Sequence, residues 1–492
     1  MDVPVMVVGA GPTGLMLAGE LALGGTDVMI IDRLDRPTGE TRGLGFTPRT
    51  MEVFDQRGLL PRFGDIVTSS RGHFGGIPID FGVLDGAHFS VQDIPQYRTE
   101  AVLAGWLADL GVRVARGREL AGLTADDDGV TAEIRAGTGT ERVRCGYLAG
   151  CDGGRSTVRR LGGFGFPGTA STMEMFLADV TGCDIRPRPI GESVSGGMAM
   201  SATIGGGTVH RIIVCELGTR PRRRSAPPES AEVAAAWQRL TGQDISGGTF
   251  LWTSAFGDGA RQAAQYRRGR VLLAGDAAHV HLPAGGQGMN VGIQDAVNLG
   301  WKLAAVAGGT APPELLDSYH DERHPVGTRL LTNTRAQGLL YLSGREMQPL
   351  RDVLTELTAY PDVGRHLAGM VSGLDVRYDL GPGAHPFLGL RVPHQELVTD
   401  SGKTSTTELL RAARGVLLDL RDDPGLRAAA RGWAHRVDVV TAVAHEPLAA
   451  SQIAGTRALL IRPDGHVAWA CPDGGRLEPA LRRWFGPMKE DP

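Results

Sequence analysis

Lysine is scarce in this 492-residue sequence, and its few cysteines follow no pairing pattern. Only three of the 51 basic residues are lysines (Lys302, Lys403 and Lys489), so Schiff-base and phosphate-clamp chemistry has few candidates. Gly402-Lys403 resembles the end of a phosphate-binding P-loop, but Leu397 stands where that motif needs its first glycine. The P-loop interpretation therefore fails.

The five cysteines contain no C-x-x-C pair, which argues against a disulfide framework and against a zinc site. No other metal-ligand spacing is apparent, so no metal is predicted. A reducing cytoplasm fits this cysteine usage. The first basic residue is Arg33, so we expect no signal peptide, and prolines and glycines interrupt the apolar N-terminal stretch, so we expect no membrane segment.

A strong charge of either sign is also missing. The chain has 51 Lys+Arg against 55 Asp+Glu and a net charge of −4. This balance provides neither the basic surface of a nucleic-acid-binding protein nor an acidic tail. We therefore expect a small-molecule ligand and no nucleic acid. Glycine, by contrast, is abundant, with 71 residues, about twice the average usage of roughly 7 %.

The length predicts several domains, since one domain usually takes roughly 100 to 200 residues. Apolar spacing predicts strand, helix and strand at 3–8, 15–23 and 28–31, and strands at 129–134, 141–150 and 270–273. Alternating apolar residues at 69–96 and 173–256 predict antiparallel sheet, with a polar loop at 219–230. Residues 292–306 are expected to be helical. The C-terminal pattern predicts helices near 406–413 and 426–433, a strand at 416–420 and a hairpin at 459–469.

The first glycine turn meets the requirements of a dinucleotide-binding motif. Gly9-x-Gly11-x-x-Gly14 follows a predicted strand and opens a predicted helix, and Asp32 ends the next strand. The glycines allow a tight turn and close approach of a pyrophosphate to the helix N-terminus, while the carboxylate suits ribose hydroxyls. The motif predicts nucleotide binding but leaves FAD and NAD(P) both open.

Two further motifs carry a resemblance to a known family. One is Cys151-Asp152-Gly153-Gly154-Arg155-Ser156-Thr157-Val158-Arg159, and the other runs from Gly275-Asp276 through Pro283 to Asn290. With the first motif, they resemble the FAD-dependent aromatic hydroxylases of the para-hydroxybenzoate hydroxylase type, and within them the hydroxylases of angucycline and anthracycline polyketides. The resemblance covers about the first 330 residues and extends more loosely, through Tyr319-x-x-Glu322-Arg323-x-Pro325, to the end of the sequence. Asp32 departs from the glutamate that is common in the family.

This resemblance implies a set of cofactor contacts. Arg42 and Gln96 would lie near the FAD pyrophosphate, Leu120 near the adenine, and Asp152 near both flavin and nicotinamide. Pro283 would lie against the flavin ring. The expected cofactor-binding residues are Gly9, Gly11, Pro12, Gly14, Asp32, Arg33, Arg42, Gln96, Leu120, Asp152, Asp276, Pro283, Gly285, Gly286, Gly288, Met289 and Asn290. Arg42 and Pro283, with Arg377 as a phenolate-stabilising arginine, are the catalytic candidates.

Apolar residues on one face of the second sheet are the substrate candidates. Met198, Met200, Trp252 and Phe256 lie on alternating stretches. By default they form a sheet core, but they would line the substrate slot if that face covers the flavin. His279 is expected to be a packing residue, not a base.

The resemblance implies an α/β fold with a Rossmann-like FAD domain, an inserted antiparallel-sheet substrate domain and a C-terminal thioredoxin-like domain. We assign 1–70, 98–172 and 265–345 to the first, 71–97 and 173–264 to the second, 346–394 to a helical connector and 395–492 to the last. The C-terminal domain lacks C-x-x-C, which leaves it a role in packing or in a homodimer.

The implied reaction is hydroxylation of an aromatic polyketide in antibiotic biosynthesis. FAD, NADPH or NADH as co-substrate, and O2 would form a flavin C4a-hydroperoxide. Only one complete dinucleotide motif is present, so NAD(P)H is expected to bind without a Rossmann domain of its own. Two alternatives stay open: Baeyer–Villiger or epoxidising oxygen insertion, and a flavin-binding protein without turnover.

Overall fold

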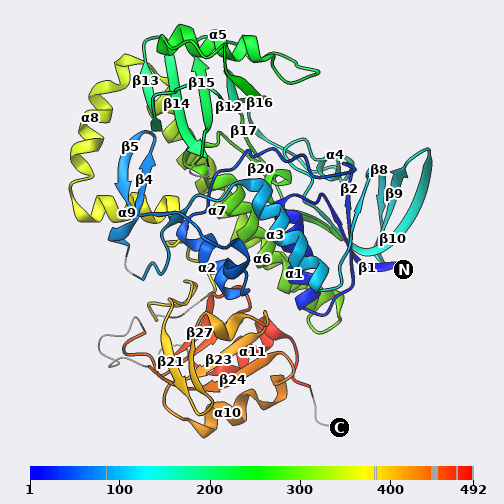
Figure 1. Cartoon of the computed structure of the whole chain (residues 1–492). Coiled ribbons are helices and arrows are strands. Elements are labelled where there is room, and N and C mark those ends of the chain that lie inside the picture. Colours follow the sequence, from blue (N-terminus) through cyan, green and yellow to red (C-terminus); the bar gives the residue numbers. More distant parts are fainter. Residues whose placement is uncertain are drawn as a thin grey trace.

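The computed structural model describes residues 1–84, 86–204, 207–381, 383, 385–444, 453–472 and 475–489. Parts of the expected domains lie outside these ranges: residue 85 in 71–97, 205 and 206 in 173–264, 382 and 384 in 346–394, and 445–452, 473, 474 and 490–492 in 395–492. The fold is mixed α/β, with a mainly parallel sheet and several antiparallel sheets (Figure 1). None of the described helices combines the length and apolar composition needed to cross a membrane.

The N-terminal sheet places four strand ends at one edge. β1 (Val3–Val8) pairs in parallel with β2 (Val28–Asp32) and β10 (Gly139–Gly150), and β10 pairs in parallel with β19 (Val271–Leu273). The strand order is β18-β19-β10-β1-β2-β7, with β7 at Val114–Arg116 and β18 at Arg267–Arg268. The residues after β1, β2, β10 and β19 belong to the three predicted motifs. The fold therefore gathers motifs that are far apart in sequence.

Helices α1 (Pro12–Leu23), α3 (Gln96–Asp109) and α6 (Gln287–Ala307) pack together beside this sheet (Figure 1). Close packing requires glycine where two helices meet, because a Cβ on Gly19 would lie 2.0 Å from the Trp106 ring. β8 (Arg118–Ala125) and β9 (Val130–Ala136) extend the sheet through β10. β8 was absent from the sequence-based prediction.

The second large sheet is antiparallel, as expected. Its order is β13-β14-β15-β12-β16, at Arg188–Val194, Gly197–Ile204, Val209–Glu216, Glu174–Thr181 and Thr249–Gly257. Helix α5 (Ser230–Thr241) covers one face (Figure 1). Trp237 packs there with Ala178 and Ile212. The prediction of sheet through this stretch was wrong, because Ala and other helix-forming residues dominate residues 231–240.

Short strands and long helices connect the two sheets. The predicted sheet at 69–96 is reduced to two ribbons, β3 (Thr68–Ser69) with β6 (Val91–Gln92) and β4 (Arg71–Phe74) with β5 (Ile77–Asp80). Three helices follow the flavin motifs: α7 (Asp317–Leu342), α8 (Gln348–Leu357) and α9 (Pro361–Ser372). α9 packs against β5, so residues separated by almost 300 positions share one small core.

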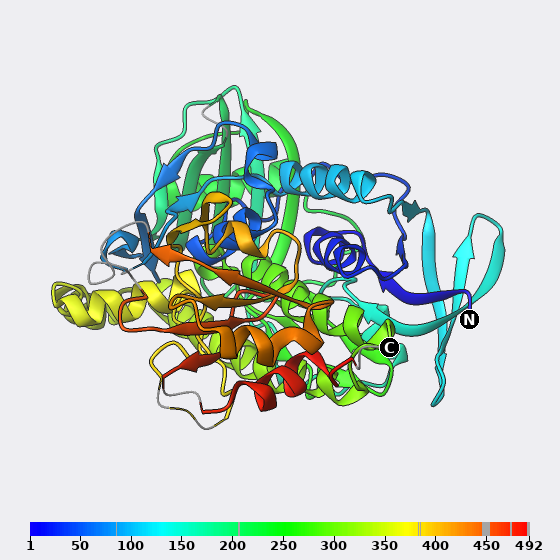
Figure 2. The same cartoon turned by 90° about the horizontal axis from the view of Figure 1, so that it is seen from below.

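The C-terminal part forms its own sheet, ordered β24-β23-β26-β27 (Figure 2). These strands are Val437–Thr441, Gly415–Asp419, Ala458–Ile461 and Val467–Cys471, and helices α10 (Pro424–Ala430) and α11 (Leu477–Phe485) flank them. A smaller sheet joins β21 (Glu396–Thr399), β22 (Gly402–Ser405) and β25 (Val443–Ala444). The hairpin predicted at 459–469 is confirmed.

The helix predicted at 406–413 is wrong, because only a 3-10 turn forms at Glu408–Leu410. Thr406 instead pairs with the chain before β21: its N–H donates to the Gln395 carbonyl and its hydroxyl to the Pro393 carbonyl. Ala413 adopts a φ of 51°, which an α-helix does not allow.

A buried ionic cluster joins the C-terminal sheet to the N-terminal part. Arg462, in the β26–β27 turn, donates to both oxygens of Glu322 on α7, at 2.6 and 2.8 Å. Lys302 on α6 donates to the same carboxylate at 2.8 Å, and Asp464 pairs with Arg462. All four side chains are at most 3 % exposed. Burial lowers the pKa of Lys302 to about 8 even beside Glu322.

Candidate flavin site

The first glycine turn is shaped by contacts that exclude side chains. Gly9 has a φ of 104°, and a Cβ there would lie 2.4 Å from the Cys151 carbonyl oxygen. A Cβ on Gly14 would lie 1.9 Å from the Gly9 carbonyl oxygen. A Cβ on Gly11, by contrast, would meet no atom within 4 Å. Gly9 and Gly14 therefore serve the fold, whereas Gly11 leaves space at the N-terminus of α1, where N–H groups are available to an anion.

Asp32 is held at the end of β2 by backbone groups. The Ala10 N–H donates to one carboxylate oxygen at 2.7 Å, and the Leu34 N–H donates to the other at 2.9 Å. Each oxygen keeps a second lone pair for a ligand hydroxyl. The side chain of Arg33 is exposed.

Arg42 and Gln96 lie on a loop and a helix that are fastened to each other. Gln96, at the start of α3, accepts from the Gly43 N–H at 3.3 Å and donates its own N–H to the Gly43 carbonyl. The neighbouring Arg42 side chain is 72 % exposed, with its guanidinium 3.5 Å from Glu40. A Cβ on Gly43 would touch Met289, so this loop lies against the third motif. Leu120 is buried on β8.

Asp152 caps a helix in the second motif. Its carboxylate accepts from the Thr157 and Val158 N–H groups at 2.6 and 3.1 Å, at the start of α4 (Thr157–Leu161). Arg159 in the same motif donates to the Ala277 carbonyl at 2.8 Å. The second motif is thereby tied to the third. These contacts are those of a helix-capping residue, and the ligand role of Asp152 stays a prediction.

The third motif forms an exposed turn before α6. Asp276 and Pro283 are exposed, and Gly285 and Gly286 have φ values of 67° and 65°, a conformation that favours glycine. An ideal Cβ on Gly288 would lie 4.0 Å from an Asp276 carboxylate oxygen, so the two ends of the motif are close. The first N–H groups of α6 have no earlier helical carbonyl to bind.

Asn290 fixes this turn against the loop before α2 (Pro48–Gln56). Its amide nitrogen donates to the Gly286 and Gly45 carbonyls at 2.9 and 3.2 Å. Its amide oxygen accepts from the Thr47 N–H at 2.9 Å. The side chain of Asn290 is thus committed to shaping the turn.

A buried chain of hydrogen bonds supports the third motif from behind, and sequence reasoning missed it. Asp295 on α6 accepts from the Gly275 N–H at 3.1 Å, lies 2.8 Å from His279 Nε2, and accepts from Arg323 at 2.6 Å. Burial would raise the pKa of Asp295, but Arg323 and His279 lower it. His279 therefore packs within a charged network, as expected of a structural histidine.

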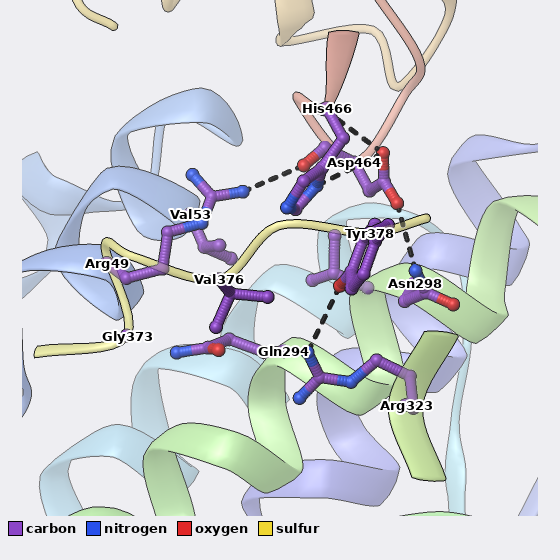
Figure 3. Close-up of a pocket in the computed structure, with 11 residues that line it drawn as sticks. Arg49, Val53, Gln294, Asn298, Arg323, Gly373, Val376, Tyr378, Asp464 and His466 are labelled. Atoms are coloured by element: carbon purple, nitrogen blue, oxygen red, sulfur yellow. Dashed lines mark hydrogen bonds and ion pairs between the residues drawn. The ribbon is translucent and has the colours of Figure 1, made fainter. Parts of the chain in front are cut away.

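This chain continues to the C-terminal part. Arg323 also donates to the Tyr378 hydroxyl at 3.1 Å, and the Tyr378 ring lies 4.2 Å from the His466 ring. Figure 3 shows these residues around a small cavity, with Asp464 beside His466 and with Arg49 on the other side, where it donates to the Asp464 carbonyl. Arg377, next to Tyr378, is exposed and donates to the Pro386 carbonyl. No described contact joins Arg377 to the three glycine motifs, and its catalytic role stays a prediction.

The structure brings three of the four substrate candidates together. Met198, Met200 and Phe256 share an apolar cluster with Leu282 and Ala284, which flank Pro283 in the third motif. Trp252 lies outside this cluster, and its indole N–H donates to Asp179 at 2.6 Å. Asp179 also pairs with the buried guanidinium of Arg211.

Residues from the first and third motifs fit an extended dinucleotide. Open space at Gly11, the fixed carboxylate of Asp32, the exposed carboxylate of Asp276 and the free first turn of α6 line the carboxyl ends of the parallel strands, where ligands of such sheets bind. An anionic pyrophosphate and a reduced flavin anion both gain from helix N-termini.

Comparison with known proteins gives the class of this protein. A family model described as FAD binding domain matches residues 2–334, and one described as aromatic-ring hydroxylase, C-terminal, matches residues 385–488. The chain belongs to the FAD-binding aromatic-ring hydroxylase family. It is a flavin-dependent monooxygenase that uses FAD, O2 and a reduced nicotinamide.

Individual relatives match over the whole length. The chain is 44 % identical to the 12-dehydrotetracycline 5-monooxygenase/anhydrotetracycline 6-monooxygenase of Streptomyces rimosus, over 99 % of both chains. The crystal structure of CabE, an aromatic hydroxylase from angucycline biosynthesis, superposes with a TM-score of 0.97 at 62 % identity, over 99 % of this chain and 100 % of that one. The structure of BexE, studied for oxidation during BE-7585A biosynthesis, gives 0.95 and 60 % over the same shares. The family and enzyme class expected from the sequence are confirmed, and the Baeyer–Villiger alternative is not favoured.

Proposed function

We propose that this enzyme hydroxylates a polycyclic phenolic polyketide of the angucycline type. The observation that carries this proposal is the apolar cluster of Met198, Met200 and Phe256 beside the flavin motif. The overall reaction converts an aromatic C–H to C–OH with one oxygen atom of O2, while NAD(P)H and a proton reduce the other oxygen atom to water. The relatives named for anhydrotetracycline and for angucycline biosynthesis support this substrate class.

FAD, when bound, accepts hydride from the nicotinamide and activates O2. The chain's own residues bind and orient it. Asp32 would hold the adenosine ribose and Asp276 the sugar-alcohol chain, while Arg42 would neutralise the pyrophosphate from its exposed position. The N–H groups that follow Gly286 would stabilise negative charge on the flavin ring.

The sheet face opposite α5 supplies the substrate slot. A flat polycyclic phenol needs apolar walls, and two methionines on β14 with Phe256 on β16 offer a surface that adapts to its shape. Packing against Leu282 and Ala284 would exclude water from the reacting carbon. A phenol activates its own ring once deprotonated, so no strong base is required of the chain.

We propose the domain assignment given above for these parts, with the C-terminal sheet as a thioredoxin-like domain. Its lone Cys471 has no C-x-x-C partner, so the domain serves packing rather than redox exchange. The buried Arg462–Glu322 contact, which this domain makes with α7, supports that role.

The experiment is oxygen labelling with a defined substrate. The FAD-loaded enzyme is mixed with NADPH, 18O2 and an angucycline phenol, and the product is analysed by mass spectrometry and NMR. We expect one labelled ring hydroxyl and substrate-dependent NADPH oxidation. A protein without a flavin spectrum after FAD has been supplied, or a labelled lactone or epoxide, would contradict the proposal. The Met198→Ala variant should raise KM more than it lowers kcat.

A further inference from the structure

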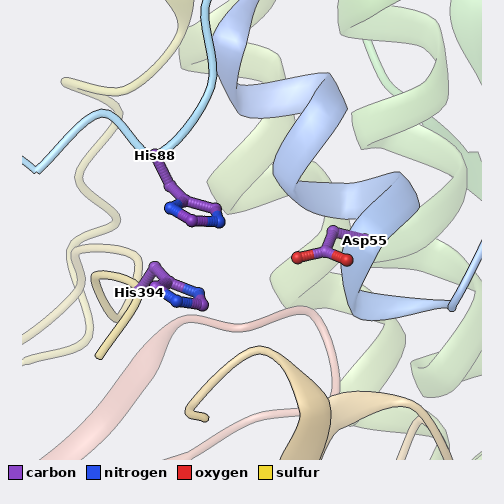
Figure 4. A group of neighbouring side chains, drawn as sticks. All are labelled: Asp55, His88 and His394. Carbon is purple, nitrogen blue, oxygen red and sulfur yellow. The ribbon is translucent and has the colours of Figure 1, made fainter. Parts of the chain in front are cut away.

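Three metal-ligating side chains from distant parts of the sequence meet where the N-terminal and C-terminal parts of the molecule touch. Asp55 lies on α2, His88 lies between β5 and β6, and His394 lies just before β21 (Figure 4). One carboxylate oxygen and one nitrogen of each imidazole lie within 4.8 Å of one another. No sequence spacing predicted this group, because each member comes from a separate segment.

The contacts of His394 leave its Nε2 lone pair available to a metal ion in one of its two neutral tautomers. Its Nδ1 lies 2.8 Å from the Thr407 hydroxyl, and its Nε2 lies 3.1 Å from a Glu396 carboxylate oxygen. A neutral imidazole that donates from Nδ1 presents a lone pair at Nε2. In the other neutral tautomer, Nε2–H donates to Glu396 and Nδ1 accepts from the Thr407 hydroxyl. A metal ion at Nε2 would select the first tautomer, because it needs the lone pair there.

Asp55 and His88 are the other two members of the group. Among the described residues, none donates a hydrogen bond to the half-buried Asp55 carboxylate. The rings of His88 and His394 are stacked, with centroids 3.7 Å apart and planes within 7°. Two charged imidazolium rings would repel each other in this position, whereas neutral rings are the form that binds metals.

We propose that Asp55, His88 and His394 bind one divalent transition-metal ion of the Zn2+ class. Two imidazoles and a carboxylate are a usual donor set for such an ion, with bonds of about 2.0 to 2.2 Å. A tetrahedral ion places its ligand atoms about 3.3 Å apart, so the group must contract from its present spread. The exposed His88 can supply that movement, and its ring must tilt because parallel rings cannot both aim a lone pair at one ion.

The charged side chains around the group do not oppose a bound cation. Glu396 is 54 % exposed and lies 3.1 Å from His394 Nε2, so its negative charge favours a cation at this nitrogen. Glu408 and Arg411 pair with each other nearby. The bound ion would clamp the C-terminal part to α2, and its binding free energy would add to the stability of the folded state.

A second histidine pair provides a matched control. His320 and His324 lie one turn apart on α7, with ring centroids 4.7 Å apart, and such a pair can also hold a metal ion. A variant at His324 therefore distinguishes the proposed site from general histidine binding.

The test uses tag-free, FAD-loaded enzyme that has been treated with a chelator. Zn2+ is titrated calorimetrically into the wild type and into the His88→Gln, His394→Gln and His324→Gln variants. We expect one equivalent to bind, affinity to fall by at least about tenfold in the first two variants, and no change in the third. Unfolding temperature should rise with Zn2+ in the wild type and in His324→Gln only.

Cobalt gives a second readout that does not depend on activity. Co2+ bound by two imidazoles and a carboxylate should show d–d absorption at wavelengths longer than those of flavin, and His88→Gln should abolish it. Because His88 is exposed, this variant is expected to fold. Absence of Zn2+ binding by the wild type, or equal binding by His88→Gln and the wild type, would overturn the proposal.

Discussion

The flavin-facing edge of the N-terminal sheet and the junction with the C-terminal part differ in how their charged groups are paired. At the edge, the recognition groups are backbone N–H groups, glycines and two carboxylates with free lone pairs. At the junction, the two cations Lys302 and Arg462 are buried with the two carboxylates of Glu322 and Asp464 and pair with them. At the flavin edge, charged and polar groups therefore stay available to a ligand. In the buried cluster, oppositely charged side chains pair with one another and hold the two parts of the molecule together.

The largest expected effect comes from glycines at the flavin edge. Gly14→Ala places a Cβ 1.9 Å from the Gly9 carbonyl oxygen, so the turn must move and FAD binding should be lost. Gly11→Ala meets no protein atom within 4 Å. Its unfolding temperature without FAD should match the wild type, while its FAD affinity falls.

Flavin absorbance after gel filtration and thermal unfolding of the apoprotein measure these two effects separately. Equal FAD binding by Gly11→Ala and the wild type would mean that the open space at Gly11 is not where the cofactor approaches. The proposal that the flavin edge keeps its groups available to a ligand would then be wrong at this position.

Substitutions at the junction should lower the stability of the protein and leave FAD binding unchanged. Arg462→Met leaves two buried carboxylates, Glu322 and Asp464, without their main partner, and this should cost about 3 to 5 kcal/mol of unfolding free energy. Arg186→Met removes an exposed pair with Glu192 and should cost less than about 1 kcal/mol. Urea unfolding measures both, and similar losses in the two variants would argue against a special role for the buried cluster.

The flavin edge could be predicted from the sequence because its signals are local. Gly9, Gly14 and Asp32 lie within one strand-turn-helix-strand unit, and each strand end lies where apolar periodicity placed it. Junction residues have no such signal. Arg462 pairs with Glu322 across 140 positions, and the sequence around either residue does not indicate which residue is its partner.

The residues at the start of α7 make several contacts that the sequence analysis did not predict. Tyr319, Glu322 and Arg323 share the start of α7 and were noticed only as a loose resemblance. The Tyr319 hydroxyl donates to the Leu273 carbonyl, Glu322 binds Arg462, and Arg323 binds Asp295. These three residues, at spacings of three and four positions, share the buried face of α7, but the residues around them are polar as well, so the sequence does not single them out.

Acid should weaken the junction in a defined pH range. Burial would raise the pKa of Glu322, but Arg462 and Lys302 lower it to about 2 from 4.5. Because the folded pKa lies below the unfolded one, this stability is present above pH 4.5 and is lost as the pH falls toward 2. The shift corresponds to roughly 3 kcal/mol.

Unfolding free energies measured across that range check this expectation. Glu322→Gln is expected to be less stable than the wild type at neutral pH and to show a shallower loss on acidification. An acid limb of unchanged slope in Glu322→Gln would assign the acid sensitivity to other carboxylates.

The smallest effect tests where the substrate slot ends. Trp252 donates to Asp179 at 2.6 Å, beside the buried Arg211, and so resembles the junction more than the flavin edge. Trp252→Phe should cost about 1.5 to 3 kcal/mol of stability, the range for a hydrogen bond to a charged group, with KM for the substrate unchanged. Phe256→Leu, within the apolar cluster, should instead raise KM with little loss of stability. If Trp252→Phe raises KM as much as Phe256→Leu does, the slot extends along the sheet to Asp179, and a buried ion pair serves the substrate as well as the fold.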